Sequence, residues 1–266
     1  MLTEVRNNLN FILKNWKYTF LASFEYKKSF FAQIIFMIIN NGFFLIFWQT
    51  VFAINDNQIN GFSYKDILFM WAIVPAAYGV ANIFFGGLNE LNRYIINGEL
   101  DAFCIQPKNI FLNVATSKCI VSAIGDLVYG VAVACFAISS IRELALYILF
   151  VFTGTVLFIC TKTIIMMLGI WIGDAETIAH IYENNLLINF SSYPESIFKT
   201  WVRVIMYTVV PAAYMAHMPV SLINSFDIKM LGIVFISVVV YILLTVLIFK
   251  KGMKRYESGS GIGLRG

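Results

Sequence analysis

Long apolar stretches, separated by short polar segments, dominate the chain and determine its predicted elements. A helix needs about 20 largely apolar residues to cross a bilayer. Six stretches qualify, namely Phe30–Ala53, Ile67–Gly86, Ile110–Ser139, Leu144–Gly173, roughly Ile197–Met218, and Met230–Phe249. The pattern therefore predicts an all-α polytopic membrane protein with six transmembrane helices, forming a single transmembrane domain over residues 1–266.

The first 28 residues follow a different periodicity. Val5, Leu9 and Trp16 share one helical face, whereas Lys14 and Lys17 lie on the others. An amphipathic helix of this kind lies along a membrane surface instead of crossing it. Residues 1–28 are therefore predicted to form an interfacial helix.

The densest group of polar and turn-forming residues interrupts the apolar pattern at 88–110, with the sequence LNELNRYIINGELDAFCIQPKNI. Leu88, Leu91 and Ile95 recur at helical spacing, which predicts a short amphipathic helix near the membrane surface. Gly98 is expected to end this helix, and Pro107 suits the first turn of the next one.

The fifth predicted span is the least regular. Ser192 and Glu195 fit a capping box that would start a helix at the cytoplasmic face. Pro211 would kink that helix because it removes a backbone hydrogen bond. The following residues are too apolar for an open loop and too broken for a straight helix, so 211–225 is expected to be a re-entrant or surface-lying outer segment.

Composition and charge agree with the membrane prediction. Hydrophobic residues make up 59% of the chain, and the mean hydropathy is +0.77, well above the usage of soluble domains. Lysine and arginine favour cytoplasmic segments, and placing both termini inside puts fourteen of them there and three outside. The inner set is Arg6, Lys14, Lys17, Lys27, Lys28, Arg93, Lys108, Lys199, Arg203, Lys250, Lys251, Lys254, Arg255 and Arg265, and the outer set is Lys65, Arg142 and Lys229.

Three motifs, in order along the chain, resemble those of ABC-2-type permeases, the membrane subunits of a class of ATP-driven exporters. The first joins Asn97-Gly98-Glu99-Leu100-Asp101 to Gln106-Pro107-Lys108-Asn109. The second is Tyr193-Pro194-Glu195-Ser196-Ile197-Phe198, with Val210-Pro211 and Met218-Pro219 downstream. The third is Lys254-Arg255-Tyr256-Glu257-Ser258-Gly259.

The resemblance implies a functional role for the polar segment at 88–109. In that family the segment forms a coupling helix that inserts into a groove on an ATPase subunit. The residues implied as ATPase contacts are Glu90, Arg93, Gly98, Glu99, Asp101 and Pro107. The resemblance also implies two ATPase subunits that carry ATP and Mg²⁺, a second identical or related permease, and a multi-pass location in a prokaryotic cytoplasmic membrane.

Two charges lie within predicted spans. A lone charge at mid-bilayer costs at least about 2.5 kcal/mol, so Asp126 and Lys162 should face protein or water. The short connection Ser140–Glu143 makes their spans an antiparallel hairpin, which predicts either an ion pair between them or a polar lining of a translocation path. Asn40 and Asn41 are weaker polar candidates, expected mainly to make helix–helix hydrogen bonds.

No catalytic constellation is evident. The chain has no G-x-x-x-x-G-K-[ST] phosphate loop, so ATP hydrolysis is assigned to another polypeptide and this chain is predicted to bind no cofactor. His180 and His217 lack metal-ligand spacing. A secondary transporter or channel, an integral membrane enzyme, and a membrane immunity or signalling protein remain as alternatives, and the exported substrate is not indicated.

Overall fold

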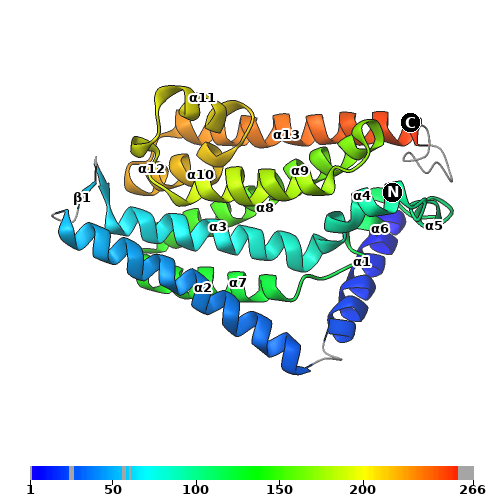
Figure 1. Ribbon diagram of the computed structural model, residues 1–266, viewed down its shortest axis with the longest axis horizontal. Helices are drawn as coiled ribbons and strands as arrows, with labels where there is room; N and C mark the ends of the chain where they lie inside the picture. The colour runs from blue at the N-terminus through cyan, green and yellow to red at the C-terminus, as the bar shows by residue number, and fades with distance from the viewer. Residues whose placement is uncertain (1, 24–26, 56–57, 60, 257–266) are drawn as a thin grey trace.

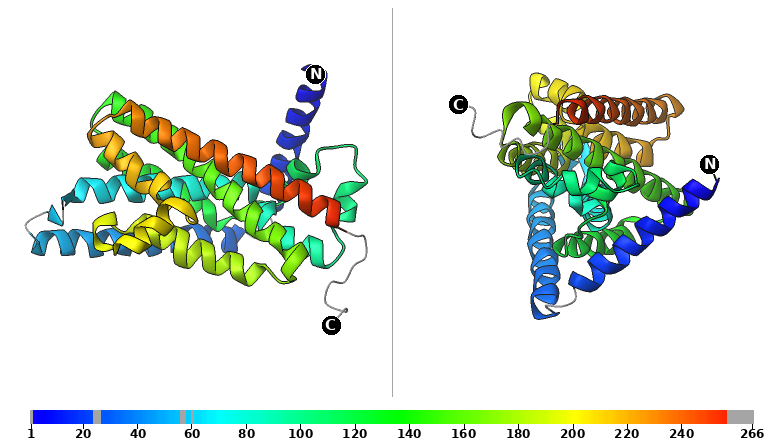
Figure 2. Two further views of the ribbon diagram at one scale, coloured as in Figure 1. Left: turned by 90° about the horizontal axis from the view of Figure 1, so that it is seen from above. Right: turned by 90° about the vertical axis from the view of Figure 1, so that its right-hand side faces the viewer.

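The computed structural model describes residues 2–23, 27–55, 58–59 and 61–256. It is a bundle of long helices aligned along one direction, with α1 standing out from the bundle (Figures 1 and 2). The helices longer than 15 residues are α1 (Leu2–Ser23), α2 (Lys27–Ile54), α3 (Tyr64–Phe85), α7 (Ser122–Ala137), α8 (Ile141–Ile172) and α13 (Ile228–Arg255).

The two ends of the bundle differ. One end, here called the hairpin end, carries the short antiparallel strands β1 (Gln58–Ile59) and β2 (Phe62–Ser63) between α2 and α3. The opposite end, here called the terminal end, holds the start of α1, the end of α13 and the polar segment 86–109 (Figure 1). Ser63 and Asp66 cap α3 reciprocally and fix its start at the hairpin end.

Four helices in the described part of the chain are long and apolar enough to cross a membrane, or five if one bent pair counts as a span. The four are α2, a run from α3 to Ile96, α8 and α13. They correspond to the first, second, fourth and sixth stretches expected from the sequence. The all-α, multi-pass architecture is therefore confirmed, whereas the remaining two expected spans differ from the structure.

The third expected span, Ile110–Ser139, is broken into α6 (Ile110–Ala115) and α7. Three polar residues, Thr116-Ser117-Lys118, lie in the break, and the amide of Ile120, in the same break, donates to the Asn82 carbonyl at 3.1 Å. Glycine permits the close contact with this region, because a Cβ at Gly87 would collide with the Val114 carbonyl oxygen. Only α7, with 16 residues, continues toward the hairpin end.

The fifth expected span, roughly Ile197–Met218, is broken near Pro211, where the sequence predicted a kink. The helix α11 (Thr200–Thr208) meets the following pair, η4 (Ala213–His217) and α12 (Met218–Asn224), at an angle of 82°. The whole segment lies at the hairpin end (Figure 1). Asn224 Nδ2 donates to Asp66 Oδ1 at 2.6 Å, which anchors α12 beside the start of α3.

A helix that joins the two ends before this segment was not expected from the sequence. It runs without interruption through α9 (Glu176–His180), the π-helical η2 (Ile181–Ile188) and α10 (Asn189–Ser192). Ser192 does not form the expected capping box, because its hydroxyl donates to the Ile188 carbonyl at 2.7 Å within this helix. Tyr193-Pro194-Glu195, with the short η3 (Glu195–Ile197), therefore follows a helix end at the hairpin end. From the sequence it was expected on the same side as the termini and the polar segment.

Two apolar clusters hold the bundle together. The larger one fills the space between α3, α7, α8, α12 and α13, and includes the fully buried Phe69, Phe150 and Phe158. The smaller one lies at the terminal end, where Leu91 and Ile95 pack with Met167 and Ile170 of α8. Large buried side chains at both ends make α3 and α8 the rigid centre of the fold.

Candidate coupling segment and intramembrane polar site

The polar segment at the terminal end consists of η1 (Gly86–Glu90), α4 (Leu91–Ile96), α5 (Asp101–Cys104) and the connection to α6. Gly98 ends α4 as expected, with a φ of 73° that residues with a side chain rarely adopt. The Leu100 amide then returns to the Tyr94 carbonyl at 2.9 Å. The result is a compact helix, turn and helix, here called the coupling segment (residues 86–109).

One face of the coupling segment is completely buried. Leu88, Leu91, Ile95 and Leu100 are at most 2% exposed, and they pack in the terminal-end cluster against α8. Closely packed side chains resist compression, so a displacement on one side of the contact is passed to the other side. Movement of the coupling segment is therefore expected to move α8.

The opposite face is open. Arg93 and Glu99 are about half exposed, with side-chain values of 49% and 47%, and their charged groups lie 3.9 Å apart. Ile105 is 84% exposed, and Pro107 beside it is also exposed. The open face of the segment therefore carries exposed apolar side chains as well as charges. Sequence reasoning missed Ile105, although it is the one large aliphatic residue between Cys104 and Lys108.

Two of the expected contact residues are turned inward. Glu90 accepts from Arg93 Nη1 at 3.1 Å and also pairs with Lys118, in the break before α7. Asp101 lies beside Tyr256 of the third motif; burial, followed by the hydrogen bond and charge of Asp101, raises the Tyr256 pKa to about 12. The first and third motifs therefore meet in space, although residues 257–259 of the third motif lie outside the described residues.

Pro107 does not stand in the first turn of the next helix. That helix, α6, begins at Ile110, and Asn109 caps it by accepting from the Leu112 amide at 3.1 Å. A short polar side chain that accepts a backbone hydrogen bond is the preferred helix start. Pro107 lies in the connection instead and restricts the backbone there.

The N-terminal helix contacts the same region from outside. Trp16 Nε1 donates to the Phe84 carbonyl at 2.7 Å, and Asn15 Nδ2 donates to Thr116 Oγ1 at 3.0 Å. The Lys108 ammonium lies 5.6 Å from the Phe11 ring centroid. The helix α1 is therefore joined to the end of α3 and to the connection that follows α5.

The two intramembrane charges do not pair with each other. Asp126 accepts from Asn41 Nδ2 at 2.8 Å, between α7 and α2. Lys162 instead forms an ion pair with Glu183 and donates to Asn89 Oδ1 at 2.6 Å. The expected pair is wrong because Glu183 lies on a helix where the sequence indicated only a connection, and this carboxylate reaches Lys162 directly.

Asn89 connects this buried ion pair to the coupling segment. Its Nδ2 donates to Asn82 Oδ1 and to the Gly86 carbonyl, both at 2.9 Å, while its Oδ1 receives the lysine. Lys162 and Glu183 are 9% and 7% exposed. Glu183 stands in the π-helical stretch η2, a geometry that is rare and frequently found at functional sites.

Asn92 makes a second connection from the coupling segment, and no feature of the sequence pattern distinguished it. It is 1% exposed. Its Oδ1 accepts from the Ala175 amide at 3.0 Å, and its Nδ2 donates to the Gly173 carbonyl at 3.1 Å. Asn92 therefore holds the turn between α8 and α9.

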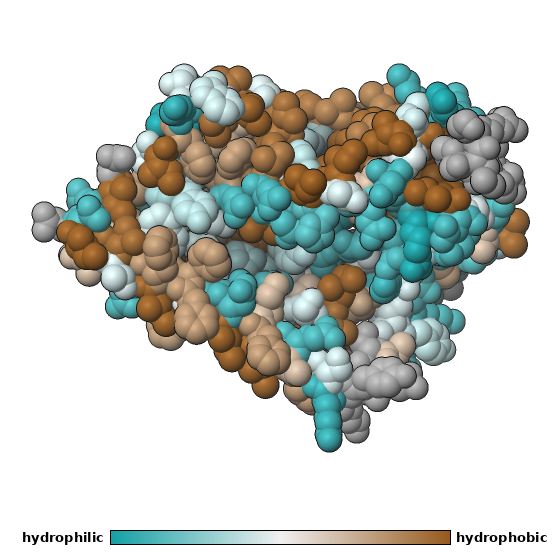
Figure 3. Space-filling model, viewed as in Figure 1, coloured by the Kyte–Doolittle hydropathy of each residue, from teal (hydrophilic) through white to brown (hydrophobic). Residues whose placement is uncertain are grey.

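A polar cavity of about 220 Å³ lies between α2, α3, α7 and the helix 176–192. Asn40, Asn41 and Asp126, three of the four intramembrane candidates, line it together with Asn184 and Asn189. Figure 3 shows hydrophilic residues across the middle of this face of the molecule. The four-residue spacing of Asn185 and Asn189, together with Asn184, could have indicated a helix with one polar face.

Polar atoms remain available in this region. Asp126 Oδ2 and Glu183 Oε1 are buried and lack a hydrogen-bond partner among the residues that the structure describes. No group of three or more side chains suited to a metal ion occurs in that same part of the chain. The cavity, here called the polar chamber, thus presents amide groups and the Asp126 carboxylate within an otherwise apolar bundle.

Long apolar helices around a polar chamber, with an exposed turn segment at one end, define a multi-pass membrane protein of the transporter type. The chain belongs to the ABC-2 transporter family, since the family model described as "ABC-2 family transporter protein" matches residues 37–260. The resemblance found in the sequence motifs is confirmed, and the chain is a membrane subunit of an ABC transporter. No curated protein matches it, and no solved structure does.

Proposed function

We propose that this chain is the permease of an ATP-driven exporter and that a polar connection couples its ATPase contact to its pathway. The observation that carries the proposal is the chain of contacts from Asn89 in the coupling segment through Lys162 to Glu183. The helix that contains Glu183 also lines the polar cavity. A shift of the coupling segment would therefore reach the cavity through buried, directional contacts.

The charge distribution supports a cytoplasmic terminal end. Lys199 and Arg203 follow Pro194 at the hairpin end, so they leave the inner set of fourteen lysines and arginines. Lys118, at the terminal end, joins this set, which then has thirteen members. The outer count rises from three to five. The count of thirteen against five still supports a cytoplasmic location for the coupling segment and both termini, in the cytoplasmic membrane of a prokaryote.

In this orientation the open face of the coupling segment meets an ATPase subunit that carries ATP and Mg²⁺. Ile105 and Pro107 supply the apolar contact, and Arg93 and Glu99 supply charges at its edge. Glu90 and Asp101 act indirectly, since their carboxylates hold Lys118 and Tyr256.

A second permease, identical or related, would cover the polar face. Asn40, Asn185 and Asn189 are exposed on that face, and uncompensated polar groups are costly against lipid tails. Pairing about a two-fold axis would enclose the two cavities in one central pathway. Closure of the ATPase subunits on ATP would then move the coupling segments and switch the pathway from inward to outward access.

The test compares two isoleucines of similar exposure at opposite ends. Ile105→Asp should weaken co-purification of the ATPase subunit at least tenfold, because burying an isoleucine is worth about 1.5–3 kcal/mol and 1.4 kcal/mol is tenfold in affinity. Ile141→Asp is the control, since Ile141 is 87% exposed and lies at the hairpin end. Equal co-purification of both variants with the ATPase would contradict the proposal.

A further inference from the structure

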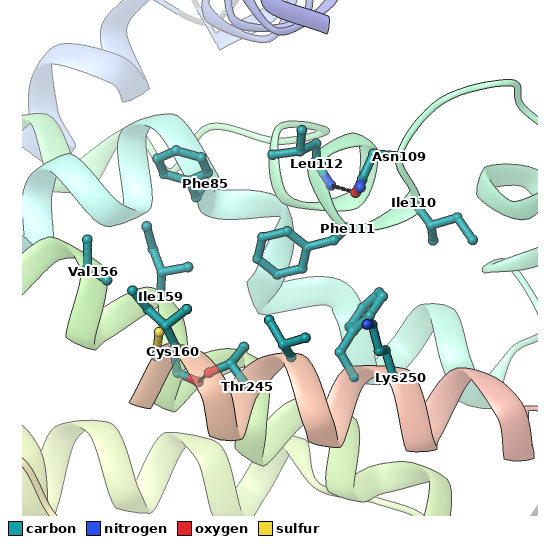
Figure 4. A pocket seen from close by; sticks show the side chains of 13 residues that line it. Phe85, Asn109, Ile110, Phe111, Leu112, Val156, Ile159, Cys160, Thr245 and Lys250 are labelled. Atoms are coloured by element: carbon teal, nitrogen blue, oxygen red, sulfur yellow. Dashed lines mark hydrogen bonds between the residues drawn. The ribbon is translucent and has the colours of Figure 1, made fainter. Parts of the chain in front are cut away.

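A second and larger cavity, here called the groove, lies away from the polar chamber, toward the terminal end between α6, α8 and α13. It has a volume of about 650 Å³, within the range of sites that bury a drug-sized ligand, about 300–1,000 Å³. Figure 4 shows the side chains that line it. Its walls are aromatic and aliphatic, with Phe85, Phe111, Val156, Ile159, Val246 and Phe249 among them.

The walls offer almost no hydrogen-bonding groups along their length. The Thr245 hydroxyl donates to the Tyr241 carbonyl at 2.7 Å within its own helix, so its hydrogen is already used. Phe111 and Phe249 pack edge to face with their centroids 5.5 Å apart. An occupant of this part of the groove therefore needs an apolar chain.

The polar groups gather at one end of the groove. In Figure 4, Asn109 and Lys250 lie toward the side of the coupling segment, whereas Val156 and Ile159 lie at the other side. Because α13 runs from the hairpin end to the terminal end, Lys250 stands near the cytoplasmic end of that helix. The groove thus has its charged end at the membrane surface and its apolar end within the bilayer.

The cations at this end are not neutralised within the described residues. Lys250, Lys251, Lys254 and Arg255 form no ion pair among them. Basic residues just inside a span attract anionic lipid headgroups. The charge and the direction of the groove together select an amphiphile with an anionic head and a hydrocarbon tail.

We propose that this groove binds one anionic phospholipid of the cytoplasmic leaflet. The lipid phosphate lies at Lys250 and Asn109, and an acyl chain runs along α13 past Val246 toward Ile242. Both aliphatic residues are also partly open to the outside, at 43% and 40% exposure, so the chain can enter sideways from the bilayer. The site is separate from the polar chamber. It rests on the proposed cytoplasmic orientation of the terminal end and not on the proposed transport mechanism.

The test is native mass spectrometry of the full chain, released from vesicles that contain equal amounts of phosphatidylglycerol and phosphatidylcholine. The parent protein should retain one phosphatidylglycerol per chain. Val246→Trp should fill the groove and reduce this retention at least tenfold. The matched control is Leu247→Trp, because Leu247 is 55% exposed on the same helix and does not line the groove.

A second pair of variants tests the headgroup and guards against misfolding. Lys250→Gln should leave a lipid bound but abolish the preference for phosphatidylglycerol, whereas Lys254→Gln, outside the groove lining, should keep most of it. Retention of phosphatidylglycerol by Val246→Trp would overturn the proposal. Equal retention of the two lipids by the parent protein would also overturn it, as would loss of the bound lipid on dimerisation, since the groove would then be a protein interface.

Discussion

At the scale of single residues, Lys162 shows how a charge inside the membrane is accommodated. Its ammonium contacts one carboxylate and one amide oxygen, from Glu183 and Asn89, and all three side chains come from different segments. Breaking a buried ion pair costs about 3–5 kcal/mol because the remaining charge stays uncompensated, whereas replacing both partners can be nearly neutral. These contacts can therefore be tested for structural and functional roles separately.

Lys162→Met and Glu183→Leu are each expected to reduce the free energy of unfolding by about 3–5 kcal/mol. Each variant should therefore unfold at a clearly lower temperature in detergent. The double variant should recover most of the stability. It should still uncouple transport from ATP, because Asn89 no longer has a connection to the helix 176–192. Recovery of both stability and transport would assign the pair a purely structural role.

Cys104 gives a pH-dependent readout of the coupling segment. Burial, and secondly the charge of Asp101, raises the pKa of its thiol above the usual 9.0. Because the thiolate is the reactive form, maleimide labelling should be slow at neutral pH and should rise about tenfold per pH unit below the pKa. Asp101→Asn should lower the pKa and speed labelling severalfold at neutral pH.

The control for this measurement is Glu99→Gln. Glu99 is a nearby carboxylate that does not contribute to the Cys104 shift. A faster rate in Glu99→Gln, or an unchanged rate in Asp101→Asn, would show that the Cys104 environment differs from the one described.

The sequence indicates which residues need a partner but not which partner they take. Asp126 and Lys162 stand out because charges are rare within apolar stretches. Their partners, Asn41 and Glu183, depend on how the helices face each other. Glu183 was not expected as a partner because asparagines interrupt the apolar pattern of its helix, and the π-helical turns do not follow the 3.6-residue period by which helices are recognised.

At the scale of elements, the uninterrupted spans were predictable and the broken ones were not. Hydropathy alone locates α2, α3, α8 and α13 to within a few residues. It fails for 110–139 because apolar residues on both sides hide a polar break at Thr116-Ser117-Lys118. Hydropathy also fails for 174–224. There, a short helix with one polar face crosses the bundle, and the more apolar segment that follows it begins and ends at the hairpin end.

The corrected position of this returning segment makes a topological prediction. Trp201 is 64% exposed on α11, at the hairpin end (Figure 1). A Trp201→Cys protein should therefore react at its new thiol with an impermeant reagent on intact cells, whereas Cys104 should react only after the membrane is opened. If the thiol introduced by Trp201→Cys reacts only in opened cells, residues 193–208 return to the cytoplasmic side.

At the scale of the whole molecule, one face is polar at mid-depth while the α2 and α13 surfaces are apolar. Ile46 and Leu243, for example, are 60% and 58% exposed. The apolar surfaces suit lipid, and the polar face suits a partner or water. The asymmetry agrees with the proposal that one chain supplies only part of a transport pathway.

Replacing Asn185 and Asn189 together by Leu should test this assignment. Without the polar groups the face can be covered by lipid, so the dimer is expected to weaken while the chain still folds. Cross-linking in the membrane would measure dimer formation, and Ile46→Asn with Leu243→Asn would be the control on the apolar surfaces. Unchanged cross-linking of the Leu variant would place the second permease elsewhere.

The shortness of α7 has a consequence for the surrounding lipid. Sixteen residues span about 24 Å at 1.5 Å each, less than the roughly 30 Å hydrocarbon thickness of a typical bilayer. Val128, Val131 and Phe136 are exposed along it, so lipid is expected to touch this helix directly. A span shorter than the hydrocarbon layer draws the two leaflets together beside it. We therefore expect the protein to thin its membrane next to α7 and to be most active in bilayers of short-chain lipids, with activity falling as the acyl chains lengthen.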